Sequence, residues 1–180
     1  MVYIFLGDGF EEIEALTACD VLRRAGAKVS LAGVGKTGIT GAHGIRVTAD
    51  CTDADVDIDA AEMLVVPGGL GGVEAMEASE NVLSLLRRAF AADKEIAAIC
   101  AGPRVLTKAG VLSGVHAVCY PGMEYEMSGI MSQEKAVVRD GKITTGRGVG
   151  CAMEFAFALA ETVCGADAAR AVAEETYFTV

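Results

Sequence analysis

The 180-residue sequence lacks several features that mark specialised classes of protein. It has no tryptophan and two histidines, and no apolar run approaches the roughly 18 residues that span a bilayer. Basic residues number 15 against 25 acidic ones, and the net charge of −10 argues against a nucleic-acid surface, which needs a basic patch. Residues 1–6 carry no basic leader, so we expect a strand there and not a signal peptide. A globular protein with neither a membrane nor a nucleic-acid partner is the expectation.

The cysteines are scattered along the chain, and no two of them form a Cys-x-x-Cys pair. Their places inside apolar segments argue against a disulfide framework and against a zinc site. The two histidines, His43 and His116, are too far apart in sequence to indicate a metal cluster. We therefore expect a reducing, cytoplasmic setting, with no metal and no cofactor. The six cysteines are Cys19, Cys51, Cys100, Cys119, Cys151 and Cys164.

Strand-like and helix-like segments alternate along the whole chain. Apolar residues make up 52% of the sequence, and its length fits one domain with a substantial core. The alternation predicts a single α/β domain over residues 1–180 with a largely parallel sheet. Glycines in 35–50 predict an edge hairpin, and Asp140-Gly141 predicts a second one. The other expected strands are 2–6, 29–34, 63–66, 95–100 and 115–120, and the expected helices are 11–25, segments within 72–92, one after Cys100, 151–164 and 166–177.

The most informative cysteine is Cys100, which follows an apolar strand and precedes Ala101-Gly102-Pro103. The pattern small-x-Cys-x-small leaves room for a tight strand-to-helix elbow that holds a nucleophile. Pro103 suits the first position of the next helix, since its fixed φ is helical. Unpaired N–H groups and the positive end of the helix favour a thiolate there. The simpler alternative is a small buried residue at a strand end.

Two other strand ends carry unusual sequences, and sites in open α/β sheets form at the carboxyl ends of strands. Gly68-Gly69 follows one buried strand, and its N–H groups, together with that of Ala101, would complete an oxyanion hole. Taken alone, a Gly-Gly pair indicates an ordinary turn. If the strands are neighbours, the loops that follow them, including Gly7-Asp8-Gly9, converge on one pocket.

Three glutamates, Glu11, Glu12 and Glu14, lie in the first turn of the first expected helix. Acidic residues there complement the helix dipole, which is explanation enough for Glu11 and Glu12. Glu14 is the better candidate for chemistry. A carboxyl in a desolvated pocket beside the cysteine keeps its proton, because burial raises its pKa, and it can then serve as acid and base.

These motifs together resemble the ThiJ/PfpI family of DJ-one-like proteins, which includes protein deglycases. The resemblance implies a flavodoxin-like three-layer α/β/α sandwich, of the class I glutamine amidotransferase-like kind, that forms a homodimer. It implies Cys100 as nucleophile and Glu14 as its protonated partner. It also implies that the backbone amides of Gly69 and Ala101 hold an oxyanion or an oxidised sulfur. Arg24 matches a family arginine at the dimer interface near the pocket. The alternative is that Arg24 is a solvated arginine on the helix surface. The matching stretches are residues 11–14, 20–26, 65–69, 97–103 and 145–148.

The sequence departs from the family at Tyr120, where many members have a histidine before the proline. A Cys–His dyad of the protease or amidotransferase kind is therefore not expected. His116 lies four strand residues away, roughly 13 Å, and cannot replace the missing histidine. Tyr120 either donates a hydrogen bond to substrate or packs as an aromatic. His43 lies in the expected edge hairpin, where the family often has a basic residue close to the partner subunit's side of the pocket; the alternative is a plain surface histidine.

The expected function is a cofactor-free cysteine enzyme that acts on reactive α-oxoaldehydes or their protein adducts, of the glyoxalase III or deglycase type. Its partners would be a small carbonyl substrate and a second copy of the chain. The alternative is a redox sensor or stress-protective protein that works through oxidation of Cys100. Thiamin-pathway chemistry and proteolysis are a third, weaker interpretation.

Overall fold

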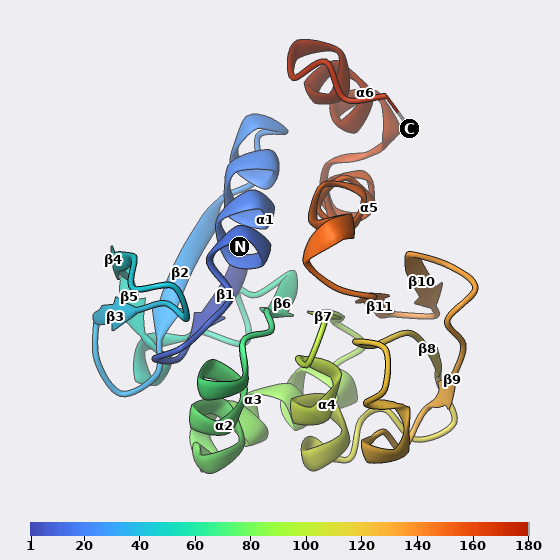
Figure 1. Cartoon of the computed structure of the whole chain (residues 1–180). Helices are drawn as coiled ribbons and strands as arrows, with labels where there is room; N and C mark the ends of the chain where they lie inside the picture. Colours follow the sequence, from blue (N-terminus) through green and yellow to red (C-terminus); the bar gives the residue numbers. More distant parts are fainter. Residues whose placement is uncertain (180) are drawn as a thin grey trace.

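A seven-stranded sheet runs through the middle of the structure, a computed structural model that describes residues 1–179 (Figure 1). The strand order is β10-β11-β7-β6-β1-β2-β5, and every neighbouring pair is parallel except β10 and β11. The three strands β7, β6 and β1 are adjacent at its centre. The strands are β1 (Val2–Leu6), β2 (Val29–Gly33), β5 (Cys51–Thr52), β6 (Met63–Val66), β7 (Glu95–Ile99), β10 (Val137–Asp140) and β11 (Ile143–Gly146).

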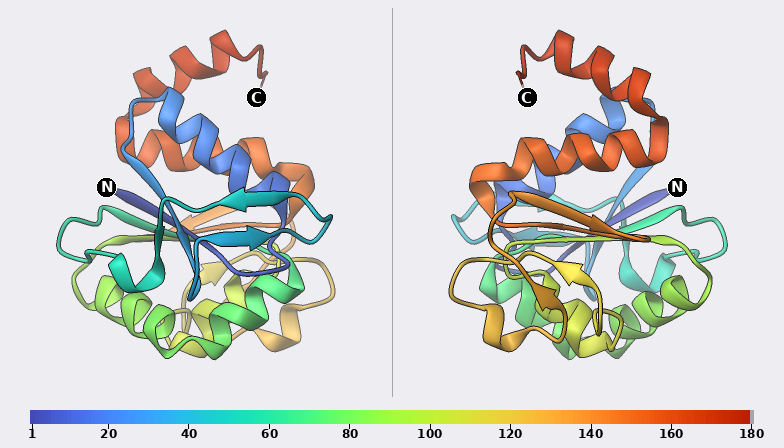
Figure 2. Two further views of the ribbon diagram at one scale, coloured as in Figure 1. Left: turned by 90° about the vertical axis from the view of Figure 1, so that its left-hand side faces the viewer. Right: turned by 90° about the vertical axis from the view of Figure 1, so that its right-hand side faces the viewer.

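Helices cover both faces of this sheet and produce three layers, as the edge-on views show (Figure 2). On one face lie α1 (Glu12–Arg24), α5 (Ala152–Cys164) and α6 (Ala166–Glu175). On the other face lie α2 (Leu70–Ala78), α3 (Glu80–Ala91) and α4 (Pro103–Ala109). This arrangement confirms the predicted flavodoxin-like α/β/α sandwich with a mostly parallel sheet. None of the helices within residues 1–179 is long and apolar enough to cross a membrane.

Strand β1 shows why the sheet needs helices on both faces. Its five residues are all buried, with Val2, Ile4 and Leu6 in one apolar cluster and Tyr3 and Phe5 in the other. Side chains alternate between the faces of a strand, so an uninterrupted apolar run is buried only when both faces are covered. Each fully buried side chain of this size contributes about 1.5–3 kcal/mol to folding.

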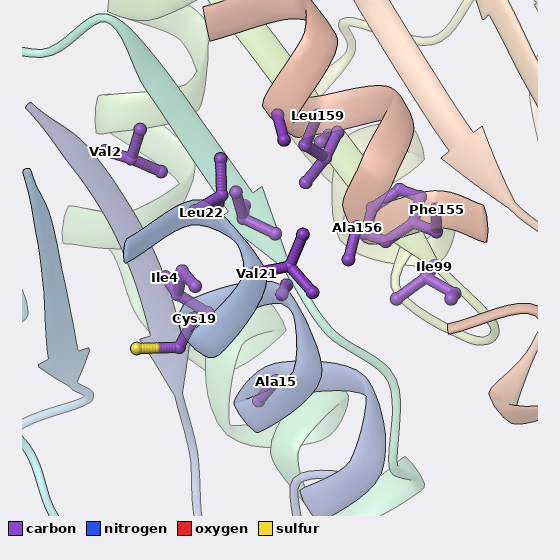
Figure 3. Packing of buried hydrophobic residues seen from close by; sticks show 14 of the residues in the cluster. Val2, Ile4, Ala15, Cys19, Val21, Leu22, Ile99, Phe155, Ala156 and Leu159 are labelled. Atoms are coloured by element: carbon purple, nitrogen blue, oxygen red, sulfur yellow. The ribbon is translucent and has the colours of Figure 1, made fainter. Parts of the chain in front are cut away.

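Helices α1 and α5 pack against each other over the same face (Figure 3). Ala15, Val21 and Leu22 of α1 lie in the apolar cluster that also contains Phe155 and Leu159 of α5. The cluster also includes the small side chain of Ala18 on α1 and Ile99 at the end of β7, which lies close to Phe155. This packing fixes α1, and with it the acidic residues in its first turn, over the central strands.

The structure differs from the predicted elements at the sheet edges. The hairpin expected in residues 35–50 is present as β3 (Gly38–Thr40) and β4 (Arg46–Thr48), which form their own two-stranded sheet. The strand expected at 115–120 is reduced to β8 (His116–Ala117), which pairs with β9 (Ile130–Met131) outside the central sheet. The reason lies in the backbone beyond β8: Val118 N–H donates to the Thr145 side chain, and Tyr120 N–H donates to the Cys100 carbonyl.

Candidate active site

The three strand ends singled out in the sequence meet at one edge of the sheet. Strand β6 pairs in parallel with β1 on one side and β7 on the other, so the segments after all three leave the sheet together. The loops also touch: Glu11 N–H donates to the Gly68 carbonyl over 2.9 Å. Gly69, with φ of +86°, has no room for a side chain, since a Cβ would stand 2.3 Å from the Gly9 carbonyl oxygen. The predicted convergence on one pocket is confirmed.

Cys100 lies on a strained turn between β7 and α4. Its φ is +64°, a left-handed conformation that is uncommon for any residue with a side chain and that marks functional turns. The turn is held by two backbone hydrogen bonds of 2.9 Å, from Cys100 N–H to Gly146 and from Tyr120 N–H to Cys100. Pro103 begins α4, as the sequence predicted. The geometry is that of the expected strand-to-helix elbow.

Glu14 lies beneath this cysteine and is 1% exposed. Its Oε2 accepts a 2.7 Å hydrogen bond from Gly68 N–H, and its Oε1 has no partner within residues 1–179. A Cβ placed on Gly68 would stand 2.6 Å from Glu14 Oε2 and 3.1 Å from the Cys100 sulfur. The carboxyl and the thiol therefore face each other across the space that the missing side chain leaves, which is the pairing predicted for these two residues.

Burial dominates the protonation of this pair. It raises the pKa of Glu14 to about 7, although the Gly68 N–H and the Cys100 thiol both lower it. Burial also raises the pKa of the Cys100 thiol, followed by the negative charge of Glu14, and the Ala101 N–H opposes both. Burial and the charge of Glu14 therefore act against the thiolate that the helix end and the Ala101 N–H were expected to favour at Cys100. The Glu14 carboxyl, whose pKa is raised to about 7, is the base that lies beside the thiol.

The predicted oxyanion hole loses one of its three donors. Gly68 N–H is bound to Glu14, so Gly68 positions the carboxyl and does not donate to a substrate oxygen. The Ala101 N–H points to the Cys100 sulfur, where it lowers the thiol pKa. Gly69 is the residue that precedes α2, so its N–H lies at the positive end of that helix. Gly69 and Ala101 are the two backbone donors that remain for a developing oxyanion.

A pocket of about 690 Å³ opens above the cysteine. Tyr120 and His43, both predicted as possible pocket residues, line it. The Tyr120 side chain is 50% exposed, so it is a wall of the pocket and not a packed core aromatic. Glu14 does not line the pocket, because Cys100 and Gly68 cover it. The lining residues are Gly9, Glu11, Ala42, His43, Gly69, Leu70, Gly71, Cys100, Ala101, Tyr120, Pro121, Gly122 and Met123.

Glu12 has a role beyond the helix-dipole interaction that its sequence position predicts. Glu12 is 3% exposed, and its carboxylate accepts hydrogen bonds from the backbone of the loop at 41–45 and contacts the His43 ring. A signal was present: Glu12 continues the buried stripe of Ala15, Cys19 and Leu22 at helical spacing, whereas Ile13 is 54% exposed. An acidic residue in an apolar stripe indicates a buried partner.

Glu11, Glu12 and His43 also offer ligand atoms within 4.8 Å of one another, which the spacing of the histidines did not predict. The Glu12 oxygens already accept from N–H groups of residues 43 and 45, so the cluster is explained without a cation. Glu11 precedes α1 but makes no side-chain capping bond.

Arg24 does not line the pocket of its own subunit. It lies in the last turn of α1, where it pairs with Asp20 at 2.7 Å and with Glu175 of α6 at 2.8 Å. These contacts support the alternative of a surface ion-pair residue. A place for Arg24 at a dimer interface stays a prediction. The six cysteines are all free, and Cys119 is fully buried.

An elbow cysteine backed by a buried carboxyl, at the edge of a three-layer sandwich, defines a class of α/β proteins. The chain belongs to the DJ-1/PfpI family, whose sequence profile matches residues 1–162. Protein dj-1beta of Drosophila melanogaster is 41% identical over 174 residues, which are 95% of this chain and 93% of that one. The protein named deglycase PfpI of Pyrococcus furiosus is 34% identical over 153 residues, which are 83% of this chain and 92% of that one.

Solved structures agree with this assignment. The crystal structure of Drosophila melanogaster DJ-1beta superposes with a TM-score of 0.96 at 38% identity and covers 99% of this chain and 98% of its own. The structure of oxidized Toxoplasma gondii DJ-1 has a TM-score of 0.94 at 34% identity, with the same coverage. The family therefore contains relatives named as deglycases as well as a structure in an oxidized form.

Proposed function

We propose that this protein is a cysteine-dependent enzyme that converts reactive α-oxoaldehydes, or their adducts on proteins, into hydroxy acids without a cofactor. Cys100 is the nucleophile and Glu14 is the acid–base residue. The observation that carries the proposal is the pairing of the elbow thiol with a buried carboxyl whose pKa is about 7. A base with a pKa near the working pH is the most effective one for proton transfer. Relatives named as deglycases support the substrate class.

The first step follows from the geometry. The Glu14 carboxylate takes the thiol proton as the sulfur adds to the aldehyde carbon, so a thiolate never has to accumulate in the buried site. Negative charge develops on the former aldehyde oxygen, which the N–H groups of Gly69 and Ala101 stabilise. Glu14 returns its proton to that oxygen and leaves a hemithioacetal on Cys100.

The second half of the reaction is an internal oxidation and reduction. The sulfur-bearing carbon and its oxygen each lose a proton, and the neighbouring carbonyl carbon and its oxygen each gain one. The hemithioacetal thereby becomes a 2-hydroxy thioester. Water then cleaves the thioester to the hydroxy acid and regenerates the thiol. One water is consumed, and no outside oxidant or reductant is needed.

The test is the release of lactate from methylglyoxal by the wild type, Cys100→Ala and Glu14→Gln. We expect both variants to lose activity by a factor of about 100 or more, since positioned acid–base groups contribute at least that much. Cys164→Ala and Glu174→Gln are matched controls: Cys164 ends α5 away from the pocket, and Glu174 is exposed on α6. Equal rates in the wild type, Cys100→Ala and Glu14→Gln would refute the proposed enzyme.

The rival function is a sensor in which Cys100 oxidises and nothing is turned over. It is favoured by the Ala101 N–H at the sulfur, which can bind an oxidised sulfur oxygen, and by the oxidized relative from Toxoplasma gondii. The raised thiol pKa argues against it, because oxidation follows thiolate character. Mass spectrometry after mild peroxide separates the two. Stepwise oxidation confined to Cys100, without lactate formation, would select the sensor.

A further inference from the structure

The Glu12 carboxylate is a buried anchor for the loop that forms one wall of the pocket. Its Oε1 accepts from His43 N–H at 2.8 Å and from Ile45 N–H at 3.4 Å. Its Oε2 lies 2.9 Å from Nδ1 of the His43 ring. The loop wraps the carboxylate so closely that a Cβ on Gly41 would stand 2.2 Å from Oε1. The main chain and the ring of His43 are thus fixed by one side chain from α1.

This contact sets which ring nitrogen of His43 faces outward. A carboxylate only accepts hydrogen bonds, so Nδ1 carries a proton and donates it to Glu12. The Nε2 edge lies on the side of the ring opposite Nδ1 and so away from Glu12, and His43 is one of the residues that line the pocket that holds Cys100. The charged groups beside the ring are Glu12 and Glu11, the latter with an oxygen 3.8 Å from Nδ1. Both raise the pKa of His43, the hydrogen bond to Glu12 most strongly.

The proposed reaction needs a proton donor that Glu14 does not supply. Glu14 does not line the pocket and lies against Gly68 and Cys100, whereas the outer part of a bound substrate would face the residues that line the pocket. Besides Cys100, the titratable residues that line the pocket are Glu11, His43 and Tyr120. Of these, histidine alone ordinarily changes charge between pH 5 and 8. His43 is therefore the residue suited to exchange a proton with the outer part of the substrate.

We propose that His43, oriented by Glu12, is the second acid–base residue of this pocket and protonates the carbon next to the one that bears the sulfur. The inference rests on the proposed function and adds the residue that protonates the outer carbon of its substrate. An α-oxoaldehyde has a neighbouring carbonyl carbon to receive that proton, whereas a simple aldehyde has none and stops at the hemithioacetal. In its imidazolium form His43 donates from Nε2 to that outer carbon, and the hydroxyl proton of the sulfur-bearing carbon restores it. The proton that the sulfur-bearing carbon itself loses passes to Glu14 and is returned to the oxygen of the outer carbon, so all four protons are accounted for. Glu12 is a positioning residue, because it acts through His43.

The experiment compares His43→Gln and Glu12→Gln with His116→Gln and Glu174→Gln, two exposed residues outside the pocket. Three quantities are measured: the methylglyoxal adduct on Cys100 by intact mass, lactate formation against pH, and the enantiomeric composition of the lactate. A histidine NMR titration of each variant reports the pKa of His43 without any turnover. If Glu12→Gln disturbs the loop at 41–45, His43→Gln still tests the proposal, because it keeps the Glu12 carboxylate that holds the loop.

We expect His43→Gln to form the adduct at the wild-type rate but to release lactate at least 100-fold more slowly. Wild-type lactate formation should fall at alkaline pH as His43 loses its proton. This alkaline limb of the pH–rate profile should be absent in His43→Gln. In Glu12→Gln the limb and the NMR titration should both move to lower pH, because the anion that stabilises the imidazolium is gone. Residual lactate from His43→Gln should lose enantiomeric purity, since protonation is no longer directed to one face.

The inference would be overturned by wild-type lactate rates in His43→Gln, or by a loss of rate that is uniform with pH and is accompanied by loss of the adduct. Failure of the proposed function looks different, because the wild type itself would then form no adduct on Cys100 and no lactate. Propionaldehyde adds a further check. It should form the hemithioacetal equally well in the wild type and in His43→Gln, and an effect of His43 on that step would assign it to binding instead.

Discussion

Gly68 N–H donates a 2.7 Å hydrogen bond to Oε2 of Glu14 and so holds the carboxyl against the Cys100 thiol. Gly68 does this with its backbone, and its missing side chain is the space in which the two groups meet. A Cβ there would stand 2.6 Å from Glu14 Oε2 and 2.7 Å from Cys100 Cβ. Glycine at position 68 therefore has two functions: its N–H positions the Glu14 carboxyl, and its lack of a side chain leaves room for the carboxyl and the thiol to meet.

Replacement of Gly68 by alanine should therefore separate the pair. We expect Gly68→Ala to reduce lactate formation at least 100-fold and to lower the free energy of unfolding by about 1–3 kcal/mol, the usual effect of overpacking a filled site. Gly38→Ala is the matched control, because a Cβ on Gly38 meets nothing within 4 Å. Activity assays and denaturant titrations of both variants check the prediction. Wild-type activity in Gly68→Ala would mean that the carboxyl and thiol need not face each other.

The raised pKa of Glu14 predicts a pH dependence of stability. The carboxyl titrates near 7 in the folded protein against 4.5 ordinarily, so between these values the folded state holds a proton that the unfolded state has lost. The contribution of Glu14 is therefore fully present below pH 4.5 and falls by about 3 kcal/mol as the pH rises to 7. Glu14→Gln removes this loss. Its stability relative to wild type should rise across that range in urea titrations, while Glu174→Gln should run parallel to wild type.

The fold was predictable because its signals are local. An unbroken apolar run such as 2–6 indicates a strand covered on both faces, and Gly, Pro and Asp-Gly pairs mark where elements end. The elbow at Cys100 and the acid at Glu14 were identified from spacing and from the family resemblance. That β1, β6 and β7 are neighbours is a property of the tertiary fold. The sequence alone did not establish it, and the predicted convergence of the three loops was conditional on it.

What the sequence did not reveal depends on contacts between distant segments. The Gly68 N–H was expected to face a substrate, because nothing in its neighbours along the chain shows that Glu14 accepts from it. The role of Glu12 required the loop at 41–45, some 30 residues away in sequence, to fold onto α1. The thiol pKa required the depth of burial at Cys100, which outweighs the helix end and the Ala101 N–H.

The same electrostatics predict how Cys100 reacts with a simple alkylating reagent. The charge of Glu14 raises the pKa of the thiol, so its removal should lower that pKa and increase the thiolate fraction. We expect Glu14→Gln to be alkylated by iodoacetamide faster than wild type at pH 8, even though it has lost turnover. Glu11→Gln should act in the same direction but less, since Glu11 contributes a smaller charge effect. Peptide mapping assigns the modification to Cys100. Slower alkylation of Glu14→Gln would show that the carboxyl promotes the thiolate instead.

The φ of +64° at Cys100 predicts a stability difference between two inactive variants. Alanine keeps the Cβ that makes a left-handed conformation unfavourable, whereas glycine adopts it freely, so the strain remains in Cys100→Ala and is released in Cys100→Gly. We expect Cys100→Gly to be more stable than Cys100→Ala by about 1 kcal/mol in denaturant titrations. The control is Ala171→Gly on the exposed face of α6, where the same alanine-to-glycine change should destabilise by about 0.5–1 kcal/mol. If the change from alanine to glycine destabilises the protein by a similar amount at positions 100 and 171, the left-handed backbone conformation at Cys100 carries no strain.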